Sequence, residues 1–341
     1  MKHWTTLLMI AALAAPAAVA AAAGPRQPAA ACTAANATQL ARCADRAREG
    51  TVDTIRITAP ITCGRRAPTC LDLRGVRHPL AVEGVGARSG LRRVAGYRAG
   101  PAVRIEGAHG IVLRNLVLDE TPVVHRTMEC TVSVVDSRDV VLERLRVRHA
   151  KLCGVGVAGG EDITVRASHF EDAQVHGLWT PNYDPPRRMR IEGNVFDGAW
   201  SNGAYVSAIA SVVAGNTFRG NHRRAVYGTS GGQLLVGAGT RGLLVTGNTI
   251  AGGRLGGKWV ASGIEFAEAD IYGVDVAGNV IEGHDGWGIA FNHGNVRMGG
   301  VQVRGNRFAR NRLGDLDYAG GYVPLVAGNC SGRDGACASA G

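Results

Sequence analysis

The residues with the clearest chemical potential lie at the same position of short segments that recur along the chain. In each segment the residues one and three after a glycine position are mostly apolar, as in Gly177-Leu178-Trp179-Thr180. If the segment is a strand, the residue between the apolar pair points to solvent. This outward position holds Trp179, Tyr205, Tyr227 and Glu265. Aromatic side chains about 4.8 Å apart on neighbouring strands would form a platform for sugar rings.

Polar and basic residues cluster around this platform and are suited to β-elimination on a uronic-acid polymer. That reaction needs a cation for the substrate carboxylate, a base and an acid. We expect Arg224 to neutralise the carboxylate and Tyr227 to donate the proton. The base is expected to be one of His176, Lys151 and His222, and the expected substrate-binding residues are Trp179, Asn202, Tyr205, His222 and Arg223.

Two other functions remain open on the same residues. Glycoside hydrolysis needs two carboxyl groups that flank the scissile bond. Glu265 fits one role, and Glu268, Asp285 or Asp184 would be its partner. A protein without catalytic activity would use the aromatic column only to bind a glycan or to stabilise a surface structure.

A Gly-Asn repeat predicts the elements that position these residues. Each repeat has an apolar residue three before the asparagine and an apolar residue two after it, as around Asn194. The six asparagines are Asn194, Asn216, Asn248, Asn279, Asn306 and Asn329, at intervals of 22 to 32 residues. Repeats this short stack into a solenoid. They are rich in Val, Ile, Thr and Gly, which favours strands over helix pairs.

The repeat resembles the right-handed parallel β-helix proteins of the pectate-lyase-like superfamily, which have an interior asparagine ladder. The resemblance implies an all-β, single-stranded right-handed parallel β-helix of about ten rungs over residues 51–330. Leu116, Leu145 and Ser168 occupy the ladder position in earlier rungs. The family's catalytic motifs, such as Asp-Pro-His and Gly-His-Gly, are absent from the sequence. The resemblance therefore supplies a scaffold and no catalytic residue. We expect no cofactor; calcium stays open as an alternative, although the sequence shows no cluster of calcium ligands.

The ends of the chain predict export. Residues 1–23 have a basic start, an apolar core and a small-residue cleavage site, which is typical of a secretory signal. Residues 24–50 are expected to be a linker and an N-terminal cap, with a helix from Asn36 to Glu49 that covers the first rung. Residues 331–341 are expected to be a tail. We expect a secreted or periplasmic protein, without a membrane segment and monomeric.

Charge and cysteine content fit that environment. The net charge of +10 favours an anionic partner, which we take to be an acidic polysaccharide and not nucleic acid. All eight cysteines follow the signal, so we expect disulfides. Cys130 and Cys153 fall in adjacent rungs, within disulfide reach. The other expected pairs are Cys32–Cys43, Cys63–Cys70 and Cys330–Cys337.

Overall fold

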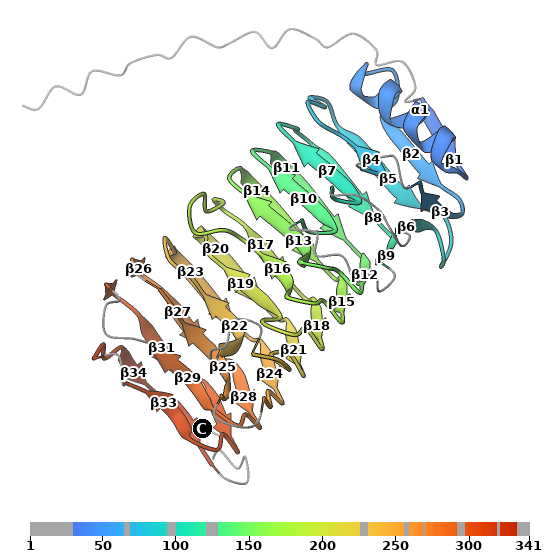
Figure 1. The fold of residues 1–341 in the computed structure, drawn as a ribbon. Coiled ribbons are helices and arrows are strands. Elements are labelled where there is room, and N and C mark those ends of the chain that lie inside the picture. Colours follow the sequence, from blue (N-terminus) through green and yellow to red (C-terminus); the bar gives the residue numbers. More distant parts are fainter. Residues whose placement is uncertain are drawn as a thin grey trace, which may run out of the picture.

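The computed structural model describes residues 30–64, 69–93, 100–120, 129–225, 231–255, 259–268, 270–291, 297–318 and 321–332. These residues form a right-handed parallel β-helix in which strands stack rung upon rung along one axis (Figure 1). The strands form three parallel sheets, and the core lies between them. The expected fold class is therefore confirmed. The predicted signal segment, residues 1–23, lies outside the described residues.

The first sheet has fourteen strands within the described ranges. They are β1 (Ala31–Ala34), β2 (Thr54–Ile57), β5 (Leu80–Gly84), β8 (Ile111–Arg114), β11 (Arg138–Glu143), β14 (Glu161–Arg166), β17 (Arg190–Glu192), β20 (Ile209–Ala214), β23 (Arg241–Thr246), β26 (Ile271–Tyr272), β27 (Asp275–Ala277), β30 (Met298–Gly299), β31 (Gln302–Arg304) and β34 (Leu325–Ala327).

The second sheet has eleven described strands. They are β3 (Pro60–Cys63), β6 (Gly90–Arg93), β9 (Val117–Glu120), β12 (Arg146–Arg148), β15 (His169–Glu171), β18 (Val195–Asp197), β21 (Thr217–Arg219), β24 (Thr249–Ala251), β28 (Val280–Glu282), β32 (Arg307–Ala309) and β35 (Cys330–Ser331).

The third sheet, which carries the site, has ten described strands. They are β4 (Leu71–Asp72), β7 (Val103–Glu106), β10 (Val132–Val135), β13 (Cys153–Ala158), β16 (His176–Trp179), β19 (Ala204–Val206), β22 (Gly231–Val236), β25 (Ala261–Phe266), β29 (Trp287–Phe291) and β33 (Gly314–Asp317).

The asparagine ladder runs along the inner corner between the first and second sheets. Asn248 shows the pattern: its Nδ2 donates to Asn279 Oδ1 and to Val213 O, each at 2.9 Å. Its Oδ1 accepts from Asn216 Nδ2 at 3.0 Å. Equivalent contacts join each ladder asparagine to the next, from Asn194 at one end to Asn329 at the other. Ser168 extends the column by one rung, since its Oγ accepts from the Leu145 amide at 3.0 Å. Because buried polar groups need partners, the ladder fixes the register of successive rungs.

The residue before each ladder asparagine turns the chain with a left-handed φ. Gly278 has a φ of +63°, and the other Gly-Asn glycines have similar values. In earlier rungs the same corner is made by Asn115, Arg144 and Ala167, at φ values of +56°, +51° and +49°. Glycine adopts this region without steric cost, whereas alanine and arginine are strained there.

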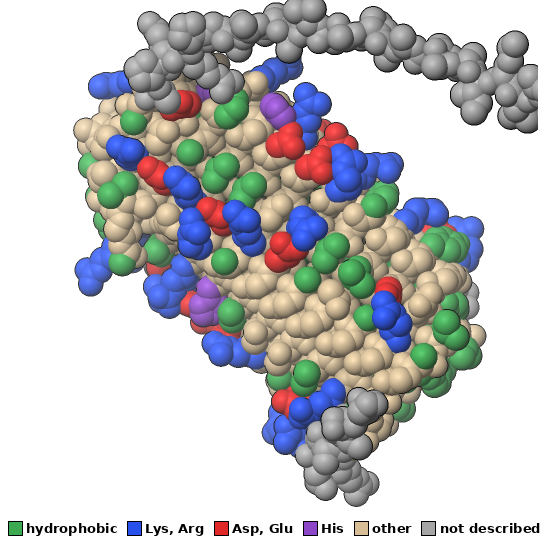
Figure 2. All heavy atoms as spheres, turned by 180° about the vertical axis from the view of Figure 1, so that it is seen from behind, with side chains coloured by type: hydrophobic (Ala, Val, Ile, Leu, Met, Phe, Trp, Pro, Cys, Tyr) green, Lys and Arg blue, Asp and Glu red, His purple; other side chains and the backbone are tan. Residues whose placement is uncertain are grey.

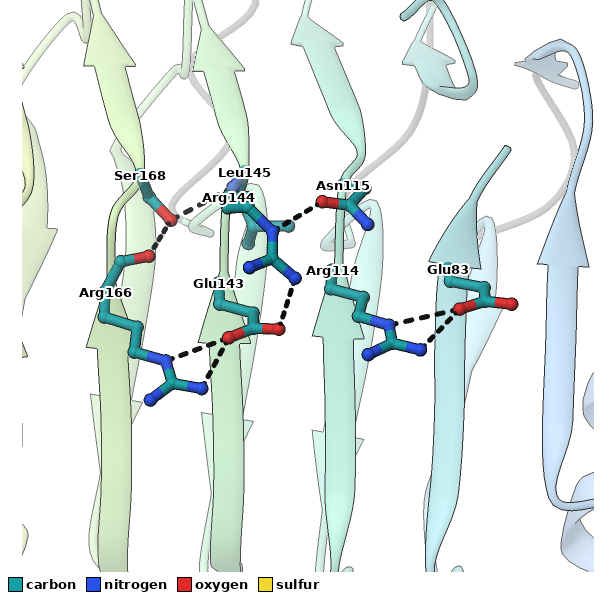
Figure 3. Close-up of polar contacts among 8 residues, drawn as sticks. All are labelled: Glu83, Arg114, Asn115, Glu143, Arg144, Leu145, Arg166 and Ser168. Carbon is teal, nitrogen blue, oxygen red and sulfur yellow. Dashed lines mark hydrogen bonds and ion pairs between the residues drawn. The ribbon is translucent and has the colours of Figure 1, made fainter. Parts of the chain in front are cut away.

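The outer face of the first sheet carries a ladder of alternating charge over six rungs. The register aligns Arg56, Glu83, Arg114, Glu143, Arg166 and Glu192 in one column. Figure 3 shows Arg114 pairing with Glu83 at 2.7 Å and Arg166 pairing with Glu143 at 2.6 Å. Rows of alternating basic and acidic side chains are also visible on the face drawn in Figure 2. Beyond Glu192 the column continues with uncharged Ala214, Thr246 and Ala277.

A helix closes the N-terminal end of the coil. Helix α1 (Ala37–Arg48) begins after Asn36, whose side chain accepts a hydrogen bond from the Gln39 amide. The buried side of α1 is formed by Leu40, Cys43, Ala44 and Ala47. Within residues 24–50, predicted as linker and cap, Ala31–Ala34 forms strand β1, which the sequence did not indicate and which pairs in parallel with β2. These small alternating residues add one more strand to the sheet beneath the helix.

The last described coil at the C-terminal end has no such cover among the described residues. Val326 of β34 pairs with Val303, which is fully buried, but Val326 itself is 42% exposed. Val323 and Leu325 beside it are also exposed.

Three of the four predicted disulfides are present. Cys32–Cys43 joins β1 to α1, Cys63–Cys70 closes a short loop, and Cys130–Cys153 links two adjacent rungs with a Cα separation of 4.4 Å. Cys337 lies outside the described residues, so the Cys330–Cys337 pair stays a prediction.

Candidate functional site

A cleft of about 920 Å³ lies over the C-terminal part of the third sheet. It brings together seven of the thirteen candidate residues named from the sequence: Trp179, Tyr205, His176, His222, Asn202, Glu265 and Glu268. Further aromatic and acidic residues in the described lining are Trp259, Trp287 and Asp317. The strands from β16 to β33 supply the floor, and the loops that follow β16 and β25 supply Asn182 and Glu268.

The column on the cleft floor follows the strand register. Trp179 pairs with Tyr205, Tyr205 with Leu235, Leu235 with Glu265, Glu265 with Ala290, and Ala290 with Asp317. Gly156, the next position beyond Trp179, has no side chain, and a Cβ added there would lie 2.5 Å from Cys130 Sγ. The disulfide Cys130–Cys153 thus occupies this end of the column.

The prediction that Tyr227 belongs to this column is wrong. The third strand of that rung is β22, which begins at Gly231, so Leu235 occupies the outward position instead. Gln233 of this strand is joined to the preceding corner, because Asn221 Nδ2 donates to Gln233 Oε1 at 2.8 Å. Tyr227 itself lies outside the described residues. The expected run of three rings is therefore a pair, Trp179 and Tyr205.

His176 and His222 are buried at the base of the cleft. Burial lowers the pKa of His176 to about 3, with the nearby His222 as a smaller cause in the same direction, so His176 is neutral at ordinary pH. The ring of Tyr205 lies edge-on to His176, with centroids 5.7 Å apart. Gly231 makes room for His222, since a Cβ at Gly231 would lie 2.3 Å from the imidazole.

Asn202 is held by the protein itself. Its Nδ2 donates to Gly232 O at 2.6 Å, and its Oδ1 accepts from Ser201 Oγ at 3.2 Å. The residue lines the cleft but is buried, so these contacts fix the shape of the wall.

Lys151, Arg223 and Arg224 do not line the cleft. Lys151 is only 8% exposed beside the buried ion pair of Arg93 and Glu120, and burial lowers the pKa of its amine. The guanidinium of Arg224 lies 3.7 Å from the centre of the Trp200 ring.

Arg223 is held elsewhere too, since it forms an ion pair with Asp172 at 2.8 Å. The basic residues expected to cluster around the aromatic platform are therefore spread over the corner beside the third sheet.

Two carboxyl groups stand on the cleft floor with one strand between them. Glu265 and Asp317 flank Ala290, which places their Cα atoms about 9.6 Å apart along the coil. Asp317 was missed in the sequence, although Gly314–Asp317 continues the outward column by one rung. Trp259 was missed because it precedes β25 and lies outside the repeated pattern.

The other expected acidic partners of Glu265 differ in position. Asp285 accepts hydrogen bonds from the Leu255 and Ala261 amides, at 2.8 and 2.6 Å, and does not line the cleft. Asp184 does not line it either. Glu268 does, at the mouth, where Asn182 Nδ2 donates to its Oε2 at 3.0 Å.

Within the described ranges, no group of three or more His, Cys, Asp or Glu side chains is arranged to hold a metal ion. Within the same ranges, no helix is long and apolar enough to cross a membrane.

Comparisons with known proteins agree with the coil. Residues 124–330, more than half of the chain, match the model of the right handed beta helix region. The chain belongs to this right-handed β-helix family. No curated protein matches the sequence.

Solved structures with the same fold come from proteins with diverse names. An alginate lyase from Paenibacillus is 11% identical with a TM-score of 0.61, covering 84% of this chain and 99% of its own. The A-module of a mannuronan C-5 epimerase from Azotobacter vinelandii is 16% identical with a TM-score of 0.53, covering 88% and 94%. A surface protein and adhesin of Streptococcus pneumoniae is 11% identical with a TM-score of 0.54, covering 86% and 93%. At such identities these structures show the fold alone.

Proposed function

We propose that this right-handed β-helix protein is a glycoside hydrolase that cleaves a polysaccharide in the cleft of the third sheet. The observation that carries the proposal is the pair Glu265 and Asp317 on a floor flanked by aromatic rings. Their separation of two strands leaves room for a water molecule beside the sugar, as inverting glycosidases require. Glu265 is almost fully buried on the floor of the cleft, and we assign it the role of general acid. Asp317 is less buried and suits the base that activates water.

The described lining supports hydrolysis over elimination. Elimination on a uronate polymer requires a positive group near each substrate carboxylate, and the cleft residues named by the structure include no arginine or lysine. The carboxylates of Glu268 and Asp317 in the cleft would repel an acidic chain. Sugar recognition by aromatic rings holds for both reactions, and the polysaccharide-active β-helix structures named above are consistent with either.

A lyase acting on an acidic polysaccharide is the second candidate, and one contact favours it. His176 is a neutral base at any pH above about 3, and the Tyr205 ring lies against it as the nearest phenol among the described lining residues. In that reaction His176 takes the C5 proton and Tyr205 protonates the leaving oxygen. The third candidate function is glycan binding without catalysis.

The test is to incubate the protein with neutral, acidic and amino-bearing polysaccharides and to measure new reducing ends and the ultraviolet absorbance of unsaturated sugar ends. Hydrolysis predicts reducing ends without that absorbance, and a loss of at least about 100-fold in Glu265→Gln and in Asp317→Asn. Glu192→Gln, on the outer face of the first sheet, is the matched control and should keep full activity. Unsaturated ends that disappear in His176→Ala would replace hydrolysis with elimination. Binding without either product would leave the non-catalytic function.

We propose in addition that the protein is exported, on the basis of residues 1–23 and the disulfides. N-terminal sequencing of the mature protein tests this, and a retained Met1 would contradict it.

A further inference from the structure

Three side-chain donors of the described cleft lining, those of Asn202, Ser201 and Asn182, are engaged within the protein. Asn202 Nδ2 donates to Gly232 O, Ser201 Oγ to Asn202 Oδ1, and Asn182 Nδ2 to Glu268 Oε2. An ionised carboxylate accepts hydrogen bonds and donates none. A ligand that binds the carboxylates of this lining is therefore expected to supply the donors.

Glu268 is a third carboxylate, beyond the two that hydrolysis uses. It is exposed at the cleft mouth, three residues after Glu265. Its contact with Asn182 joins the loop after β25 to the loop after β16, three rungs away in the third sheet. This contact leaves Oε1 of Glu268 available, and it holds the carboxylate at the rim over the aromatic floor.

Four aromatic side chains line the same cleft: Trp179, Tyr205, Trp259 and Trp287. Their faces pack against the C–H faces of sugars, and they also attract cations through the ring quadrupole. The aromatic rings and the carboxylates thus both favour a positively charged ligand. The cleft contrasts with the whole chain, whose formal net charge is +10.

We propose that the cleft takes a glycan with free amino groups, such as a de-N-acetylated hexosamine polymer, and that Glu268 binds one protonated amine. The inference rests on the proposed function for the location of the glycan, and it adds the chemical class. Glu268 is a specificity-determining residue in this scheme, and Glu265 and Asp317 remain the pair that cleaves. A protonated amine supplies three donors and a positive charge to a lining that offers acceptors and π faces.

The experiment compares two oligosaccharides of equal length, one of glucosamine and one of N-acetylglucosamine, by calorimetric titration of the full-length mature protein at mildly acidic pH. The amino oligosaccharide should bind at least about tenfold more tightly, and added salt should reduce that preference. Glu268→Gln, which keeps the size of the side chain, should reduce the ratio to about twofold or less. Asp139→Asn removes an equally exposed carboxylate that pairs with His109 outside the cleft, and it should leave the ratio unchanged.

Equal affinity for both oligosaccharides would overturn the inference, and so would weak binding of both. It would also be overturned if Glu268→Gln weakened both ligands equally, because Glu268 would then act only on the shape of the wall. Cleavage of neutral glycans that is lost in Glu265→Gln would leave the proposed hydrolase standing in those cases. Preference for the amino ligand without cleavage of any glycan would instead support the inference and refute the hydrolase.

Discussion

The N-terminal and C-terminal halves of the coil differ in where polar groups connect one rung to the next. In the N-terminal half the connection is outside, in the alternating column from Arg56 to Glu192. In the C-terminal half the continuous column is inside, in the ladder from Asn194 to Asn329, whereas outer pairs such as Arg219–Asp197 and Arg304–Asp275 each join only two rungs. The two columns overlap only near Glu192 and Asn194, in the same turn of chain.

The corners change together with the columns. Where Leu145 fills the inner position, the corner residue Arg144 donates to Asn115 Oδ1 at 2.7 Å and pairs with Glu143 (Figure 3). Where asparagine fills it, the corner is glycine. A buried amide network is costly to interrupt, whereas exposed ion pairs each contribute little. The comparison therefore predicts that stability depends more on the inner column than on the outer one.

The largest effect is expected for Asn248→Leu. The substitution removes the side-chain hydrogen bonds to Val213 O and Asn279 Oδ1 and the acceptor of the buried Asn216 amide. The free energy of unfolding should fall by about 3–5 kcal/mol, measured by urea denaturation. Thr246→Ala, at the end of β23 two residues before Asn248, should change it by less than about 0.5 kcal/mol. Equal losses in the two variants would contradict the importance of the ladder.

A smaller and opposite pair of effects is expected at the corners. Gly278→Ala places a Cβ at a φ of +63° and should cost about 1 kcal/mol, although no atom lies within 4 Å of the new group. Ala167→Gly, at a φ of +49°, removes the same strain and should be neutral or stabilising by up to about 1 kcal/mol. Thermal unfolding of both variants measures the difference, and a matching loss in both would show that strain does not decide these corners.

The smallest effect is expected for Glu83→Gln in the outer column. Hydrogen bonding by Arg114 holds the pKa of Glu83 below its usual 4.5, with Arg56 as a further cause. Because the folded-state pKa is the lower one, this pair stabilises the protein above about pH 4.5, and the contribution is lost as the pH falls further. The variant should cost less than about 1 kcal/mol at neutral pH and nothing at high salt. A cost that persists in high salt would contradict a screened surface pair.

The coil was predictable from sequence because its signals are local and repeated. Asn216 and Val213 recur with fixed spacing, and the pairing of Cys130 with Cys153 follows from the length of one rung. The path around Tyr227 was not predictable, because Arg224-Ala225-Val226-Tyr227 imitates the alternation of a strand. Only the inner ladder from Asn221 to Gln233 shows that the strand starts later.

The cleft was predictable only in part, for related reasons. Register carries outward positions from rung to rung, so Trp179, Tyr205 and Glu265 were found together. No such rule holds for residues at corners. Lys151 therefore lies near Glu120 and Arg224 lies over the Trp200 ring, and neither lines the cleft. Glu268 meets Asn182 across 86 residues, a contact between loops that no repeat encodes.

The unequal ends of the coil make the molecule directional. At the N-terminal end, helix α1 ends the stack, since another turn added there would have to displace Leu40 from the interior. At the opposite end of the described coil, Val326 of β34 is 42% exposed and offers an apolar surface on which a further turn can pack. Within this part of the chain, a designed turn is therefore better accommodated at the C-terminal side, where it displaces no buried helix residue.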